Sequence, residues 1–131
     1  MATVAFRYSP LSPPGPTALV TVLSPVDSIS IEDLPALVDT GADQTVIPEA
    51  IANRLDLNPK DRELVVGFDG AVQHLITYQL VLQIKNLTAV NFTVICSPLI
   101  PHIILSRDIL NRYVIRLDGP NQRIEISEPG N

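Results

Sequence analysis

The chain has 131 residues, of which 46% are hydrophobic and 18% are charged, a balance typical of a globular protein with one buried core. Its 9 basic and 14 acidic residues give a net charge of −5, which excludes a basic surface for nucleic acid, and no apolar run approaches the roughly 20 residues of a membrane span. The first residues lack the pattern of a secretory signal. We therefore expect one cytoplasmic domain over residues 1–131, with neither nucleic acid nor membrane as a partner.

The first part of the chain alternates apolar and polar residues with a period of two, the pattern of half-buried strands. It predicts strands over residues 3–8, 18–23 and 28–32. Between the first two strands lie residues 9–16, where four prolines remove backbone donors and favour an extended surface connection. We interpret this Pro-rich loop as a connector, with a self-cleavage site as the alternative.

The rest of the chain predicts more strands and two short helices. Alternation over residues 78–84 indicates a half-buried antiparallel strand. Proline placement and apolar spacing predict helices over residues 48–57 and 107–112. Turn-forming residues between 113–117 and 123–127 predict a final hairpin. The expected fold class is all-β, a closed barrel-like sheet with one or two short helices.

The residues that commonly bind metals are few and scattered. Cys96 is the only cysteine, so it forms no internal disulfide, and its apolar neighbours predict a small buried side chain. His74 and His102 are far apart in the sequence, and no Cys or His pair has the spacing of metal ligands. We predict no metal and no cofactor.

The strongest chemical signal is the stretch of residues 36–43, an apolar strand that ends in Asp39-Thr40-Gly41. The apolar run anchors the turn, and Gly41 allows a close approach of backbone. Asp39 is thereby held at a strand end, where a carboxylate in partly apolar surroundings is costly unless it is paired or used. This pattern predicts Asp39 as a reactive carboxylate.

Three motifs together resemble the retropepsin-like aspartic proteases of retroviruses, retrotransposons and small cellular relatives. They are the active-site stretch at 36–48, the Gly-Phe-Asp-Gly turn at 67–70 and the closing segment at 101–112, which begins Pro-His-Ile-Ile-Leu-Ser-Arg-Asp. Their order and spacing match the family over roughly residues 18–127. The resemblance implies the retropepsin fold and an aspartic endopeptidase with Asp39, Thr40 and Gly41 at its catalytic centre.

That chemistry requires two carboxyl groups, one ionised to activate water and one protonated to bind the scissile carbonyl. The chain supplies the Asp-Thr-Gly triplet once, so the simplest solution is a homodimer in which Asp39 faces its symmetry copy. Two like charges about 3 Å apart cannot both ionise, so we expect an acidic optimum. The predicted substrates are peptides or proteins.

The resemblance also assigns roles to the neighbours of Asp39. Thr40 is implied to reach across the two-fold axis to the backbone of the partner. Asp43 is implied to form an ion pair with Arg107 and to accept hydrogen bonds from the substrate backbone, a geometry that the arginine fork suits. Gln44 stands where retroviral members often place an acid, which suggests a substrate preference of its own.

A flap over about residues 63–77 is expected to cover the site, with Gly67, Phe68, Asp69 and Gly70 at its turn and in contact with substrate. An ordinary tight turn is the alternative. Asp69 is either an exposed turn residue or a charge that repels acidic substrates. The resemblance implies cleft walls from a largely apolar set, which predicts cleavage between bulky hydrophobic residues: Ala42, Val46, Phe68, Pro101, His102 and Ile104.

Two features leave alternatives open. Ser106 stands where the closing segment of the family usually carries glycine, so the added hydroxymethyl group is expected to alter or weaken activity. An inactive or weakly active binding or dimerisation module with the same fold is therefore the rival interpretation. Subunits of this type commonly join through their chain ends, and residues 3–8 and 123–127 are the candidate interface strands, each expected to offer an exposed edge.

Overall fold

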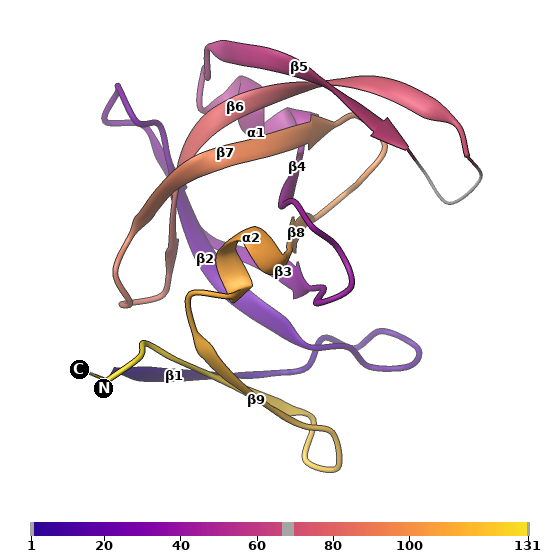
Figure 1. The fold of residues 1–131 in the computed structure, drawn as a ribbon. Coiled ribbons are helices and arrows are strands. Elements are labelled where there is room, and N and C mark those ends of the chain that lie inside the picture. Colours follow the sequence, from indigo (N-terminus) through magenta and orange to yellow (C-terminus); the bar gives the residue numbers. More distant parts are fainter. Residues whose placement is uncertain (1, 67–69, 131) are drawn as a thin grey trace.

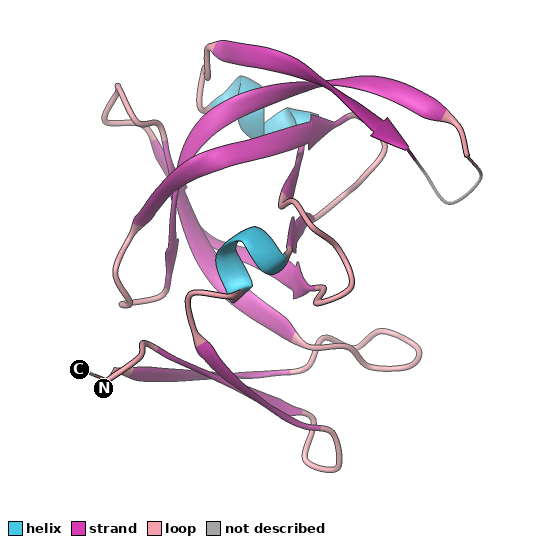
Figure 2. Ribbon diagram, in the orientation of Figure 1, coloured by secondary structure: helices cyan, strands magenta, loops and turns pink. Residues whose placement is uncertain are grey.

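The computed structural model describes residues 2–66 and 70–130 (Figure 1). Strands dominate the described residues, and the two helices are short (Figure 2). In chain order the elements are β1 Thr3–Arg7, β2 Thr17–Leu23, β3 Ser30–Val38, β4 Val46–Pro48, α1 Glu49–Arg54, β5 Pro59–Val66, β6 Val72–Ile84, β7 Val90–Ser97, β8 Ile103–Leu105, α2 Arg107–Leu110, β9 Val114–Asp118 and β10 Arg123–Ser127.

The larger sheet closes on itself. Its order is β2-β3-β8-β4-β7-β6-β5, and β2 pairs with β6 as well as with β3. Six of these strands thus form a ring, and β5 extends it as a hairpin arm on β6. The predicted all-β barrel-like architecture is confirmed.

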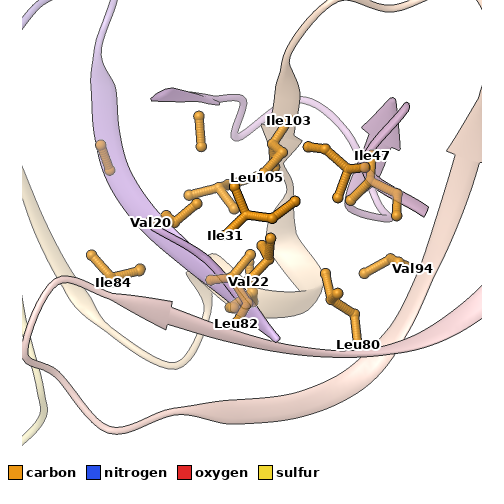
Figure 3. Packing of buried hydrophobic residues seen from close by; sticks show 14 of the residues in the cluster. Val20, Val22, Ile31, Ile47, Leu80, Leu82, Ile84, Val94, Ile103 and Leu105 are labelled. Carbon is orange, nitrogen blue, oxygen red and sulfur yellow. The ribbon is translucent and has the colours of Figure 1, made fainter. Parts of the chain in front are cut away.

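The interior of the barrel is filled by aliphatic side chains from alternate strand positions. Leu80, Leu82 and Ile84 on β6 are fully buried, whereas Gln79 and Gln83, at alternate positions of the same strand, are only partly covered. Figure 3 shows these side chains meeting Val20, Val22, Ile31, Ile47, Val94, Ile103 and Leu105 from the other strands of the ring. Each such burial contributes about 1.5–3 kcal/mol, so the core rather than the short helices stabilises the barrel.

Both helices are shorter than expected. The first ends at Arg54 rather than near residue 57, because Asp56 adopts a left-handed backbone with a φ of 50°. The second ends at Leu110 instead of residue 112, and the chain then turns into β9. Cys96 lies in β7 with 7% of its surface exposed, so the expected burial of this thiol is confirmed.

The third strand is longer than the pattern at 28–32 indicates. It continues to Val38 through an irregularity, where the register against β2 shifts between Val20 and Val22 and Asp33 has a φ of 56°. Such a bulge lets one strand bend while it stays paired. Pairing then resumes and carries the chain directly to Asp39.

A second sheet of three strands joins the chain ends in the order β1-β10-β9. Its inner face is apolar, with Ile124 and Ile126 fully buried in the same cluster as Val4 and Phe6. The expectation that residues 123–127 offer an exposed edge is wrong. That strand is central and pairs on both sides, so the free edges belong to its neighbours β1 and β9.

The Pro-rich loop is an exposed connection between β1 and β2, with a single bridge from Ser9 to Gly15 at its neck. No helix among residues 2–66 and 70–130 is long and apolar enough to cross a bilayer.

Candidate active site

Asp39 follows the last residue of β3, where that strand runs parallel to β8. Val38 is paired with Leu105, and the Asp39 amide then donates a 2.9 Å hydrogen bond to the carbonyl oxygen of Leu105. The loop of residues 39–45, called the Asp39 loop below, begins at this bond and ends at β4. In the single chain the Asp39 side chain is exposed.

The carboxylate of Asp39 is oriented by its own loop. Its Oδ1 atom accepts a 2.9 Å hydrogen bond from the Gly41 amide, the geometry of an Asx turn. A Cβ atom on Gly41 would lie 3.3 Å from the same Oδ1, tighter than an ordinary van der Waals contact. A residue with a side chain at position 41 would therefore crowd the carboxylate of Asp39, and glycine avoids this contact.

Arg107 lies against the opposite side of the Asp39 loop. Its Nη2 atom forms an ion pair with Asp43 Oδ1, and its Nη1 atom donates to the carbonyl oxygen of Thr40 at 3.3 Å. The two side chains of the ion pair are 47% and 82% exposed, so its net contribution to stability is at most about 1 kcal/mol. The guanidinium group of Arg107 therefore fixes the conformation of the loop and contributes little to the stability of the fold.

The loop is also joined to α2 through backbone bonds. The Arg107 amide donates to the Ala42 carbonyl oxygen at 3.0 Å, and the Asp108 amide donates to the Asp43 carbonyl oxygen at 3.2 Å. Leu105, Arg107 and Asp108 thus all contact the loop. Hydrogen bonds to the segment of residues 105–108 thus hold the Asp39 loop in its conformation.

Thr45 and Asp108 are site residues that the sequence analysis did not find. The Asp108 carboxylate accepts hydrogen bonds from the Thr45 amide at 2.9 Å and from the Thr45 hydroxyl at 2.7 Å. Thr45 is fully buried, although it lies only two residues after the exposed Asp43. Nothing in the local pattern connects residues 63 positions apart, and the only available signal was an acid beside Arg107.

Ser106 is fully buried between these contacts. Its amide donates to Thr45 Oγ1 at 3.2 Å, while its own hydroxyl finds no partner among the described residues. The hydroxymethyl group therefore lies inside the fold, away from the surface around Asp39. The neighbouring bonds of Leu105 and Arg107 to the loop are intact at 2.9 and 3.0 Å.

The predicted cleft residues fall into two groups. Ala42, Val46 and Ile104 are partly buried, and the last two are paired between β4 and β8 beside the loop. Pro101 and His102 are exposed in the connection before β8. Gln44 is exposed in the loop itself.

The predicted flap corresponds to the β5–β6 hairpin. Gly70 lies at its described end with a φ of 78°, a conformation that favours glycine. Gly67, Phe68 and Asp69 fall outside the described residues. In Figure 1 the hairpin and the Asp39 loop both project to the right of the barrel.

Across residues 2–66 and 70–130, no group of three acidic, His or Cys side chains is arranged to hold a metal ion. The site presents the carboxylate of Asp39 and, on the same loop, the ion pair of Asp43 with Arg107. A carboxylate held in one orientation can accept or donate a proton.

Comparison with known families agrees with this geometry. Residues 28–112 match the model of the family described as gag-polyprotein putative aspartyl protease, and the match covers more than half of the chain, including the Asp39 loop and α2. The chain belongs to this family. No curated protein sequence gives a significant match.

Solved structures of aspartic proteases share the fold. The chain is similar to the EIAV protease, solved with an inhibitor, at 27% identity and a TM-score of 0.58, covering 74% of this chain and 86% of that one. It is also similar to a retropepsin-like aspartic protease from Rickettsia conorii, at 12% identity and a TM-score of 0.66 over 95% and 90% of the two chains. The foamy viral protease-reverse transcriptase matches at 21% identity and a TM-score of 0.55, covering 75% of this chain but 12% of that longer one. The predicted retropepsin fold is confirmed.

Proposed function

We propose that two copies of this chain form an aspartic endopeptidase, with Asp39 and its symmetry copy as the catalytic pair. The observation that carries the proposal is the presentation of Asp39. It is an exposed carboxylate at a strand end, oriented by Gly41, in a member of an aspartyl protease family. Each chain holds one such loop, so the reaction requires a second copy.

In the proposed reaction, the ionised member of the pair removes a proton from a bound water as it attacks the peptide carbonyl. The protonated member donates a hydrogen bond to the carbonyl oxygen. The proton taken from water then passes to the amide nitrogen as the carbon–nitrogen bond breaks and the amine leaves. Because the two carboxyl groups share one proton, the activity should favour acidic pH. Thr40 is proposed to hold the two loops together across the two-fold axis.

The proposed substrate is an extended peptide with bulky hydrophobic residues at the cleaved bond. Ala42, Val46 and Ile104 supply apolar walls beside the loop. The β5–β6 hairpin is proposed to close over the peptide as the flap and to pair with its backbone. Asp43 is proposed to accept a hydrogen bond from the peptide backbone with the oxygen that Arg107 leaves free.

The test is cleavage of a peptide library at pH 4 to 7, followed by mass spectrometry. Wild type and Asp39→Asn are compared with Asp27→Asn, which changes an exposed acid in a distant turn. Acid-favoured cleavage that is retained by Asp27→Asn and reduced by a factor of about 10³ or more in Asp39→Asn supports the proposal. Sedimentation equilibrium on the same samples establishes whether the chain is dimeric.

The rival function is an inactive binding module. The observation that favours it is the buried hydroxyl of Ser106, which has no hydrogen-bond partner among the residues that the structure describes. A dimeric wild type that binds peptides without cutting them at any pH would establish the rival.

A further inference from the structure

The Asp39 loop is fixed at both ends to one short segment of the chain. At its start, the Asp39 amide is bonded to the Leu105 carbonyl oxygen. At its end, Thr45 is bonded to Asp108 by both its amide and its hydroxyl. The exposed residues with proposed chemical roles begin at the first anchor, with Asp39 itself, and end before the second.

Thr45 is the more elaborate of the two anchors. Its hydroxyl donates to Asp108 and accepts from the Ser106 amide at 3.2 Å, while its carbonyl oxygen accepts from the Ile95 amide at 3.0 Å. Every polar group of this fully buried residue is therefore used. A threonine bound in this way fixes the direction in which the loop enters β4.

The Asp108 carboxylate is the acceptor that completes this arrangement. Its Oδ2 atom receives the Thr45 amide, and its Oδ1 atom receives both the Thr45 hydroxyl and the Ile109 amide, at 2.9 Å. Asp108 does not touch the exposed carboxylate of Asp39. Its interactions act on the loop that carries Asp39.

We propose that Asp108 is a positioning residue for Asp39, acting through Thr45. The inference rests on the proposed protease function, and it assigns to Asp108 a task separate from that of its neighbour Arg107. Arg107 holds the exposed middle of the loop through Thr40 and Asp43, whereas Asp108 holds its buried end. An error of about 1 Å in the placement of Asp39 would lower turnover by about 100-fold.

An asparagine has the same shape as this carboxylate but cannot accept all three of its hydrogen bonds. The amide group offers one acceptor oxygen and one donor NH2 group. If the oxygen faces the Thr45 amide, the Thr45 hydroxyl loses its acceptor, and the NH2 group faces the Ile109 amide, which is also a donor and keeps only its 3.1 Å bond to the Ser106 carbonyl oxygen. If it is turned round, the NH2 group faces the Thr45 amide. In either orientation an N–H donor of the asparagine faces another N–H donor, and at least one hydrogen bond to the end of the loop is lost. Asp108→Asn should therefore loosen the end of the Asp39 loop.

The experiment compares Asp108→Asn with Asp118→Asn. Asp118 is a matched control, because its carboxylate also accepts a backbone and a side-chain hydrogen bond, both from Asn121, in the distant β9–β10 turn. Hydrogen exchange measured by mass spectrometry gives a readout that does not depend on activity. We expect amides of residues 39–45 to exchange about tenfold faster in Asp108→Asn, with β6 and β7 unchanged.

Kinetics then tests the link to Asp39. We expect kcat of Asp108→Asn to fall about 10- to 100-fold with KM nearly unchanged, at a temperature well below its unfolding transition. Thr45→Val should behave similarly. Thr45→Ser keeps the hydroxyl, so its hydrogen exchange and its kcat should both be close to those of the wild type. Asp118→Asn should match wild type in kcat and in the exchange of the Asp39 loop.

Two results would overturn the inference. One is wild-type exchange of residues 39–45 in both Asp108→Asn and Thr45→Val. The other is faster exchange throughout the barrel in proportion to lost stability, which would make the role merely structural. A wild type that cleaves no peptide would refute the proposed function instead, and the exchange measurement would still decide whether Asp108 orders the loop.

Discussion

The Asp39 loop and the β5–β6 hairpin are both proposed to contact substrate, yet they are held in different ways. The loop is bonded along its length to residues 105–108. Strand β5 lies at the end of its sheet and, among residues 2–66 and 70–130, is paired with β6 alone. Its exposed apolar residues include Leu64 and Val66, which are 61% and 64% exposed. Chemistry requires a fixed carboxylate, whereas admission of a peptide requires a cover that can move.

The base of the hairpin marks where this difference begins. Lys60 donates to Gln79 at 3.2 Å and to Thr93 at 2.8 Å, which ties the start of β5 to β6 and β7. Beyond the base, Leu64 is paired with His74, and Val66 with Val72, without a further strand beside them. Changes in the loop should therefore alter turnover, and changes at the far end of the hairpin should alter substrate binding.

Among changes at Arg107, Ser106 and Val66, Arg107→Lys should give the largest effect, because it alters the contacts of the middle of the fixed loop. Lysine keeps the charge but cannot reach Thr40 and Asp43 with two separate nitrogen atoms. We expect kcat/KM to fall about tenfold or more, while the free energy of unfolding changes by less than about 1 kcal/mol because the ion pair is exposed. Arg54→Lys, at the exposed end of α1, is the control. Equal losses of stability and activity would contradict this separation.

Ser106→Ala should give an effect of intermediate size, and it should increase the free energy of unfolding instead of lowering it. It removes a buried hydroxyl that has no partner within the described part of the chain, and the extended backbone there, with φ −116° and ψ −176°, suits alanine. We expect a gain of about 1 kcal/mol in chemical denaturation. Ser106→Gly should preserve or raise turnover. A large loss of activity in the glycine variant would show that the serine itself supports the Asp39 loop.

Val66→Thr should give the smallest change in stability. Threonine keeps the branched shape that favours a strand, and the side chain is already 64% exposed, so unfolding should shift by less than about 0.5 kcal/mol. We expect KM for a hydrophobic peptide to rise a few-fold with kcat nearly unchanged. Steady-state kinetics on one peptide identified by the library decides this, and a change confined to kcat would place the hairpin with the fixed loop.

Local pattern was sufficient to predict the barrel and the position of Asp39 at the end of a strand, because strand alternation and the Asp-Thr-Gly triplet lie within short stretches of sequence. The contact of Arg107 with Asp43 followed from the family resemblance. Thr45 and Asp108 were not identified as site residues, because each is a common residue type at its position. Thr45 is a threonine before a strand, and Asp108 is an acid at the start of a helix. Their partnership exists only after β8 has inserted between β3 and β4.

The order of the terminal sheet could not be predicted for a similar reason. The β9–β10 hairpin is local and its turn is visible in the sequence, but the docking of β1 on β10 joins opposite ends of the chain. Apolar alternation identifies a strand and its buried face. It does not identify the neighbour of that strand.

The pairing of β1 with β10 also has a consequence for the order of folding. Thr3 lies opposite Ser127, so the first strand must wait for nearly the whole chain before it finds its neighbour. Contacts between such distant residues slow folding, because a long loop must close before any stabilising contact forms. During synthesis the barrel strands can begin to pair while β1 is still alone, and we expect the terminal sheet to assemble only after β10 has been made.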